Sequence, residues 1–281
     1  MLNILKMDFY RMIHTKSMYI IWIILTGMLL FTTYLNASEW ESMQEYTAQE
    51  QQIVELVSDD TVNIGMEVML PTELGEKVTV YDQIYSNMRA KFFALFMVLF
   101  TVLFSTADVT SGYVKNIAGQ VKDRSNLVIS KAVVLIVFTV ITMLGIILVQ
   151  AIANRLFYGY LEWGSIRDFA GYTGMQMLLH CALVLVVMTL AIILKNNVWS
   201  IVIAVCLCMN LSVVLYSGID KLLHGMGFKD FQLCKYTLTG NIELLSMNLG
   251  GKGYVTAFAT GLVFLITMPV LSGYVFKKRD I

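Results

Sequence analysis

Six apolar stretches, each about long enough to cross a bilayer, constrain the fold of this chain more than any other feature. A helix that spans the hydrocarbon core needs about 20 mostly apolar residues. Of the 281 residues, 57% are hydrophobic and 14% are charged, whereas soluble domains average roughly 45–50% and about 25%. The sequence therefore predicts an all-α integral membrane protein with spans at 18–35, 92–110, 132–153, 172–194, 198–217 and 254–276.

Two of these apolar stretches allow more than one interpretation. Residues 195–197 (Lys-Asn-Asn) alone separate the fourth and fifth stretches. A charge and two amides are costly in the middle of a bilayer, so we expect a tight helical hairpin there. The first stretch follows a basic segment, as in a signal peptide, but its 18 apolar residues exceed the usual core of roughly 7–15. We therefore expect it to be an anchor.

Residues 1–17, before the first span, have the pattern of an amphipathic helix. Apolar residues recur there at helical spacing, and Lys6 and Arg11 fall elsewhere on the helix. Such a helix lies in the membrane interface. The apolar positions are Leu2, Leu5, Phe9, Met12 and Ile13.

Charge segregation predicts the orientation. The long segment 38–88 holds eleven acidic residues and one basic residue, Lys77, whereas the short segments on the opposite side carry lysine and arginine next to the spans. By the positive-inside rule, both termini are cytoplasmic and 38–88 is an acidic extracellular loop. We expect the loop to begin as an external helix or helical hairpin and to become irregular around Gly65, Pro71 and Gly75. It is either a vestibule for a cationic substrate or a solvated cap.

Several catalytic motifs are missing. The Gly-Gly-Lys-Gly at 250–253 fails as a phosphate loop, because Ser246 replaces the first glycine and Gly253 replaces the magnesium-binding Ser or Thr. The sequence has no His-Glu-x-x-His and no Gly-x-Ser-x-Gly, and its three histidines are not spaced as a metal pair. We therefore expect no catalytic site, metal or bound cofactor. The net charge of zero also argues against a nucleic-acid partner.

The segment between the second and third spans, 108–131, mixes apolar and basic residues. A short amphipathic helix there would lie at the cytoplasmic membrane face and could dock into the groove of a partner protein. A solvated basic loop that only sets the orientation is the alternative. The candidate coupling residues are Val114, Lys115, Ile117, Val121, Lys122, Asp123 and Arg124.

The order of these elements resembles the permease subunits of ABC transporters of the ABC-2 (type V exporter) class. In that family, an acidic residue near the end of span two precedes a glycine, a basic residue, an apolar stretch, an arginine and a Ser-Lys that opens span three. This sequence has Asp where Glu is commoner, and Lys122-Asp123 where a proline is often found. The matching residues are Asp108, Gly112, Lys115, Ile117, Arg124, Ser130 and Lys131.

The resemblance implies partners that the sequence alone does not reveal. It implies a separate ABC ATP-binding subunit that supplies ATP and Mg, and a second permease copy or a paralogue that completes a dimer. It also implies a bacterial plasma membrane, surrounding membrane lipid, and a cytoplasmic coupling helix whose position is supported by Asp108, Gly112 and Lys131. Asp108 is then expected to pair with Lys115 or Arg124.

Polar residues inside the expected spans are few. Ionisable groups within a membrane are functional candidates by default. His180, Gln150 and Asn210 are therefore candidates for a transport pathway. Hydrogen bonding between packed helices is the alternative for all three, and we favour it for His180.

These features predict a transport subunit that exports a hydrophobic or amphipathic substrate, with a cationic peptide as one candidate. The alternative is a membrane sensor or assembly protein that binds a ligand through residues 38–88. An ion-coupled carrier would require an inverted repeat, and none is evident in the sequence.

Overall fold

The computed structural model describes residues 2–49, 68–73, 75–110, 124–209, 211–227, 231–248 and 251–278, and the regular structure within these ranges is entirely helical. This confirms the all-α prediction. Four uninterrupted helices are long and apolar enough to cross a membrane. They are α2 (Lys16–Gln49), α6 (Ser125–Phe157), α7 (Ile166–Leu194) and α11 (Lys252–Lys277).

Two bent helix pairs accompany them. The helices α3 (Val80–Arg89) and α4 (Phe92–Thr110) meet at 56°, and α8 (Asn197–Cys208) and α9 (Leu211–Gly225) meet at 69°. The described part of the chain thus holds four candidate spans by length and apolar composition, or up to six if each bent pair counts as one. The remaining helices are short: α1 (Leu2–His14), η1 (Leu233–Tyr236) and α10 (Leu238–Leu244).

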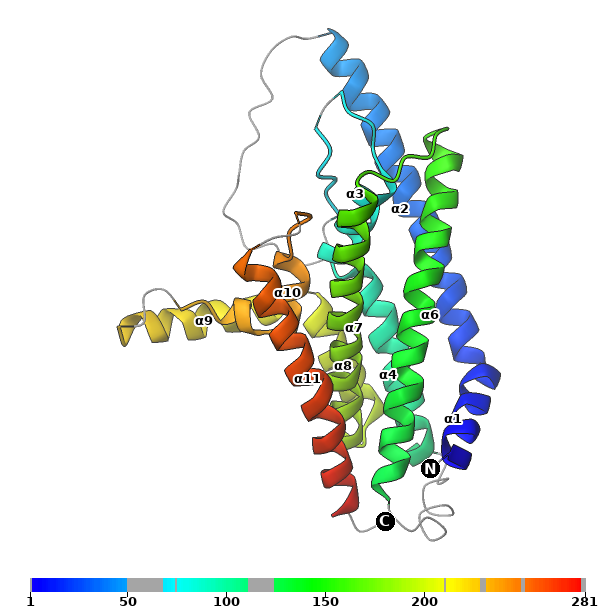
Figure 1. Ribbon diagram of the computed structural model, residues 1–281, viewed down its shortest axis with the longest axis vertical. Helices are drawn as coiled ribbons and strands as arrows, with labels where there is room; N and C mark the ends of the chain where they lie inside the picture. The colour runs from blue at the N-terminus through cyan, green and yellow to red at the C-terminus, as the bar shows by residue number, and fades with distance from the viewer. Residues whose placement is uncertain are drawn as a thin grey trace.

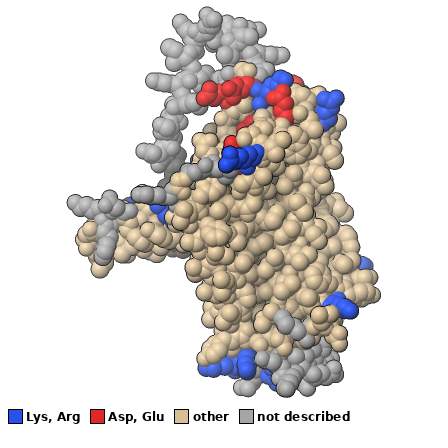
Figure 2. All heavy atoms as spheres, in the orientation of Figure 1, with Lys and Arg blue, Asp and Glu red and all other residues tan. Residues whose placement is uncertain are grey.

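The bundle has two distinguishable ends (Figure 1). Both termini lie at one of them, which we call the terminal end, and the connection from α6 to α7 lies at the other, the distal end. On the face shown in Figure 2, acidic side chains occur only towards the distal end, whereas basic ones occur at both ends. The surface of the bundle between the ends carries almost no charge on this face, as a lipid-exposed band requires.

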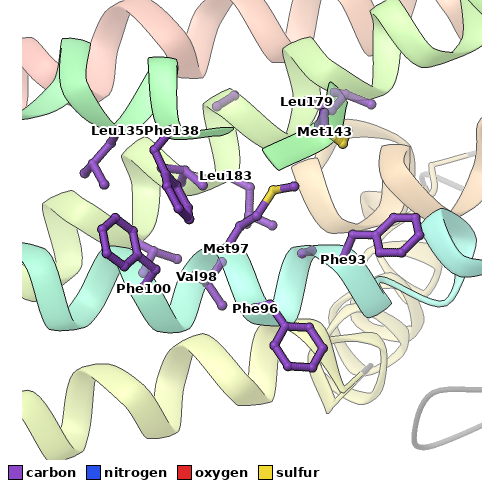
Figure 3. Packing of buried hydrophobic residues seen from close by; sticks show 14 of the residues in the cluster. Phe93, Phe96, Met97, Val98, Phe100, Leu135, Phe138, Met143, Leu179 and Leu183 are labelled. Atoms are coloured by element: carbon purple, nitrogen blue, oxygen red, sulfur yellow. The ribbon is translucent and has the colours of Figure 1, made fainter. Parts of the chain in front are cut away.

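The core of the bundle forms around α4, whose sequence is apolar on nearly every side. A helix with this pattern buries its whole surface. Phe93, Met97 and Phe100 are fully buried, and the Phe100 ring centroid lies 4.1 Å from that of Phe138 on α6. Figure 3 shows α4 side chains meeting residues of α6 and α7, including Leu183.

The turn between α7 and α8 forms the expected hairpin. Lys195 adopts a left-handed conformation (φ 53°) that ends α7, and its N–H bonds to the carbonyl of Ala191. The side-chain oxygen of Asn196 then accepts hydrogen bonds from the N–H groups of Val198 and Trp199, which caps α8. The polar residues between the two helices therefore make the turn itself.

The expected single helix over 198–217 requires correction. The structure divides this stretch into α8 and α9, which point in different directions. The stretch is apolar on average, and a single amide residue, Asn210, does not by itself predict a break. The cause lies in tertiary contacts, because α9 is fixed sideways by hydrogen bonds to η1, to α10 and to Phe231 just before η1.

The acidic segment 38–88 also differs from the expectation. Its first part is helical to Gln49, as expected, but this helix is a continuation of α2 and not a separate element. The described residues around Pro71 and Gly75 form no helix, as expected, but the segment ends in a helix that was not expected, because α3 begins at Val80 with a capping box. In this box the Thr79 hydroxyl accepts from the Asp82 N–H, and the Asp82 carboxylate accepts from the Thr79 N–H.

Candidate functional site

The candidate coupling segment connects α4 to α6, and the structure describes its two flanks. Asp108 lies in the last turn of α4, and Arg124 is the residue that precedes α6. The carbonyl of Arg124 accepts a hydrogen bond from Leu127 N–H at 3.2 Å, so it belongs to the first turn of α6. Gly112, Val114, Lys115, Ile117, Val121, Lys122 and Asp123 lie outside the described residues.

A buried carboxylate ties α1 to the start of α6. Ser130 Oγ donates a hydrogen bond of 2.6 Å to Asp8 Oδ2, and Arg11 Nη1 lies 3.6 Å from Asp8 Oδ1. Asp8 is only 3% exposed because it falls on the face of α1 that also carries Met12. A buried charge needs such partners to offset its lost hydration. The amphipathic helix is therefore held to the bundle by polar contacts as well as by apolar packing.

A buried ammonium ties the start of α6 to the end of α4. Lys131 is 6% exposed, and its Nζ donates to the carbonyl of Ser105 at 3.3 Å. The same ammonium lies 5.6 Å from the ring centroid of Phe104, within cation–π range. The carbonyl dipoles at the C-terminal end of a helix favour a cation at this position.

The end of α4 has one further polar contact. Thr106 Oγ1 donates to Asn197 Oδ1 at 3.2 Å, which joins α4 to the first residue of α8. We call Asp8, Arg11, Ser105, Ser130 and Lys131 the terminal-end cluster. This cluster, the Thr106–Asn197 contact and the described flanks of the candidate coupling segment lie at the same end of the molecule. Of the five residues of the terminal-end cluster, sequence analysis had named only Lys131 as a candidate site residue. Ser130 had been named only as part of the Ser-Lys pair that matches the ABC-2 pattern.

The candidate pathway residue His180 is fully buried on α7. Its Nδ1 lies 2.7 Å from the carbonyl oxygen of Gln176. A carbonyl only accepts, so Nδ1 carries the proton and the neutral ring presents a bare acceptor at Nε2. Among the residues that the structure describes, that atom has no hydrogen-bond partner. We expected His180 to bond to another helix, but the hydrogen bond that it makes is within α7. The third candidate pathway residue, Asn210, lies outside the described residues.

The candidate pathway residue Gln150 belongs to a cluster of amide side chains between α2, α3 and α6. Gln150 Nε2 donates to Thr33 Oγ1 at 3.1 Å and to Asn154 Oδ1 at 2.9 Å. Closer to the distal end, Asn36 Nδ2 donates to Gln83 Oε1 at 3.0 Å. All five residues are buried, and none is charged. Gln150 is therefore engaged in packing between helices.

The helix α3 is the largest feature that sequence analysis missed. Gln83, Ser86 and Asn87 are polar yet buried, so their polarity makes the segment look exposed in the sequence. Gln83 Nε2 reaches Tyr158 OH at 2.8 Å, and burial raises the pKa of the Tyr158 phenol. The regular spacing of Tyr81, Ile84 and Met88 was the available signal of a buried helical face.

A second missed feature is a buried ion pair at the bend between α3 and α4. Lys91 occupies that bend in a left-handed conformation (φ 59°), and its side chain is 1% exposed. Its Nζ lies 2.6 Å from Glu243 Oε2 on α10, whose side chain is 30% exposed. The pair fixes the short α10 against the bend.

The connection between α6 and α7 is joined to the segment before α3. Lys77 Nζ donates to Glu162 Oε1 at 2.6 Å, and Val80 N–H donates to the carbonyl of Glu162 at 2.8 Å. The hydrogen bond and charge of Glu162 raise the pKa of Lys77 above its ordinary value. This distal-end contact holds the described part of the acidic segment over the bundle.

The described residues offer cavities but no metal centre. Within those ranges no group of three or more His, Cys, Asp or Glu side chains is placed to hold a metal ion. A cavity of about 390 Å³ lies between α10 and α11, lined by residues that include Lys235, Asn241 and Tyr254. A groove of about 250 Å³ runs between α2 and α6 beside Trp22, whose Nε1 donates to Thr142 Oγ1 at 3.0 Å.

Comparison with known proteins identifies a family. A family model described as "Protein of unknown function (DUF2705)" matches residues 43–281. No curated protein matches the chain. The matched region begins near the end of α2 and contains all the helices that follow it. Since it covers most of the sequence, the chain belongs to the DUF2705 family.

Proposed function

We propose that the chain is the membrane-spanning permease subunit of an ABC transporter of the ABC-2 type. In this proposal the polypeptide crosses the membrane six times. The fifth crossing is made in two parts, with α8 in one half of the bilayer and η1 with α10 in the other. The coupling helix of the family would then fall in the segment between α4 and α6.

The observation that carries the proposal is the terminal-end cluster. A segment that transmits movement from an ATPase must be attached rigidly to the spans on both sides. The hydrogen bond from Lys131 to Ser105 joins the start of α6 to the end of α4, and the hydrogen bond from Ser130 to Asp8 joins the start of α6 to α1. A displacement of the segment between α4 and α6 would therefore be transmitted to α1, α4 and α6 together.

The chain would depend on partners for energy. The sequence carries no phosphate loop of its own, so ATP and Mg would be bound by a separate ATP-binding subunit. A second copy of the chain, or a paralogue, would complete the transmembrane unit. The termini and the candidate coupling segment would face the cytoplasm of a bacterial cell, in keeping with the basic residues near this end.

The proposed substrate is hydrophobic or amphipathic and is exported. Between its two ends the described core of the bundle is mostly apolar, and the charged side chains buried in it lie on the short helix α1 (Asp8), at the bend between α3 and α4 (Lys91) and near the start of α6 (Lys131), an arrangement that suits such a molecule better than a small ion. The acidic segment on the opposite side favours a positively charged substrate, such as a cationic peptide.

Co-purification tests this proposal. The tagged chain is extracted in mild detergent from its native membrane, and the bound proteins are identified by mass spectrometry. We expect an ATP-binding subunit at near-equal stoichiometry, and we expect Arg124→Glu to lose it because the charge beside the docking segment is reversed. Arg155→Glu makes the same change at the distal end, where Arg155 is exposed, and should keep the subunit.

Two results would contradict the proposal. One is a chain that purifies without any nucleotide-binding protein. The other is an Arg124→Glu variant that keeps its ATP-binding partner as well as the parent chain does. Equal expression and equal elution in size-exclusion chromatography are required of both variants, so that loss of the partner is not loss of folding.

A sensor or assembly protein is the second candidate function. It is favoured by the continuous extension of α2 to Gln49, which carries this helix past the neighbouring ends of the bundle (Figure 1). That function would predict a distal-side ligand and no ATP-binding partner. The same purification therefore separates the two candidates.

A further inference from the structure

The helix α9 is amphipathic, and the polar side chains on one of its faces make hydrogen bonds to the rest of the protein. Tyr216 OH and Thr239 Oγ1 lie 2.9 Å apart, and the N–H of Leu233 donates to Asp220 Oδ1 at 2.8 Å. Tyr216 and Asp220 are one helical turn apart and so share a face of α9. A third contact on this face is made by His224, whose Nε2 donates to the carbonyl of Phe231 at 2.9 Å.

The outward face of α9 is an apolar stripe. Its five members follow one another at intervals of four, four, three and four residues, which places them on one side of the helix. Each is between 42% and 74% exposed, so no described part of the chain covers them. The stripe consists of Leu211, Leu215, Ile219 and Leu222 on α9, and of Met226 in the turn that directly follows the helix.

The length of α8 sets the depth at which α9 begins. Asn197, the first residue of α8, is bonded to Thr106 near the C-terminal end of α4 and so lies towards the terminal end. Twelve helical residues rise about 18 Å, whereas the hydrocarbon core is about 30 Å thick. The chain therefore turns by 69° into α9 after it has passed the middle of the bilayer.

From that depth α9 runs sideways. Figure 1 shows it projecting sideways from the bundle, across the direction of α6, α7 and α11. A helix in this position has acyl chains around it and no water to satisfy polar groups. Tyr216 and Asp220 are partly buried and meet that requirement through their hydrogen bonds to protein, and the exposed His224 meets it at Nε2 through the carbonyl of Phe231. An outward apolar stripe is what such surroundings favour.

We propose that α9 lies in the plane of the membrane, within the leaflet at the distal end, with its apolar stripe against lipid acyl chains. The occupant of this surface is the bilayer itself. Lys221 falls on the third side of the helix, where its flexible stem can carry the ammonium to the headgroups. This assignment requires only that the chain is membrane-embedded, and it holds whether or not the chain serves transport.

Site-directed spin labelling tests the proposal on the full chain reconstituted in liposomes. Labels are placed at Leu215→Cys and Leu222→Cys in a background with Cys206→Ser and Cys234→Ser, since those two native cysteines are partly exposed. Collision with oxygen, which concentrates in acyl chains, is compared with collision with a water-soluble nickel complex. Leu148→Cys, on the exposed surface of α6, is the lipid reference, and Glu76→Cys is the water reference.

We expect both α9 labels to behave as Leu148→Cys does, with fast oxygen relaxation and little effect of nickel. Labels that follow Glu76→Cys instead would show that α9 projects into water, and the proposal would fail. Labels protected from both reagents would show that a protein surface covers the stripe, a second copy of this chain being one source, and this too would overturn it. The background protein, which has no introduced cysteine, is treated with the same spin label and must show no signal. This checks that the buried Cys181 and Cys208 stay unreactive.

Discussion

Charged side chains are buried at both ends of this bundle, and each is paired with a partner that the sequence places far away. Asp8 meets Ser130 near the terminal end, and Lys91 meets Glu243 on the side of α10. Removing one partner of a buried ion pair costs more than the pair itself contributes, because the other charge stays behind without its hydration. The two partners of Lys91–Glu243 differ in exposure, so their loss has unequal effects.

We expect Glu243→Gln to destabilise the protein more than Lys91→Met. The glutamine variant removes the carboxylate from an ammonium that is 1% exposed, at a cost of roughly 3 kcal/mol. The methionine variant leaves a carboxylate whose side chain is 30% exposed and can be hydrated. Thermal unfolding of the detergent-solubilised variants measures the difference. A larger decrease in Tm for Lys91→Met than for Glu243→Gln would contradict the conclusion that Lys91 is the more deeply buried partner of the pair.

At the scale of elements, α10 and η1 form a tight unit in which a glycine is required by contact. A Cβ on Gly240 would overlap the carbonyl oxygen of Cys234 and lie 2.5 Å from its Sγ. The neighbour is backbone, so it cannot move aside as a side-chain tip can. The close packing of α10 on η1 therefore depends on the absence of a side chain at this position.

Gly240→Ala is expected to destabilise the protein by about 1–3 kcal/mol, the usual range for inserting atoms into a packed site. Gly145→Ala on α6 is the matched control, since a Cβ there meets nothing within 4 Å. Alanine is a better helix former than glycine, so the control should keep or raise the Tm. Both are measured by thermal unfolding in detergent. Equal Tm values for the two variants would count against the packing of α10 on η1.

Hydropathy was a reliable guide to some elements and not to others, for physical reasons. The helix α4 begins and ends where its apolar run does, because its whole surface is buried in protein or lipid. The helix α3 was missed because Gln83 and Asn87 are polar, and their burial depends on Asn36 and Tyr158 from other helices. Hydropathy averages over a window and carries no information about such distant partners.

The candidate site was predictable to a similar degree. Lys131 and Arg124 could be singled out from local pattern, and both flank the connection between α4 and α6. Asp8 could have been noticed as an acid on the apolar side of an amphipathic helix, since it lies one turn before Met12. Its partner Ser130 lies 122 positions away, and only the folded structure brings the two together.

At the scale of the whole molecule, the arrangement of charge and helix ends predicts sidedness. Lys6 and Lys278 are exposed at the terminal end, and Glu76 is exposed in the segment before α3. If the bundle crosses the membrane six times, the two lysines share one side and Glu76 lies on the other. The basic terminal end should face the cytoplasm.

Cysteine labelling in intact cells that express the protein tests this topology. The variants Lys6→Cys, Lys278→Cys and Glu76→Cys are made one at a time with Cys206→Ser and Cys234→Ser, and exposed to a maleimide that does not cross membranes. We expect Glu76→Cys to react at once, and the two terminal variants to react only after the membrane is permeabilised. Reaction of Lys6→Cys and Lys278→Cys from opposite sides would mean an odd number of crossings. The segment from α8 to α10 would then fail to reach the distal side, and both the six-span topology and the depth assigned to α9 would fall with it.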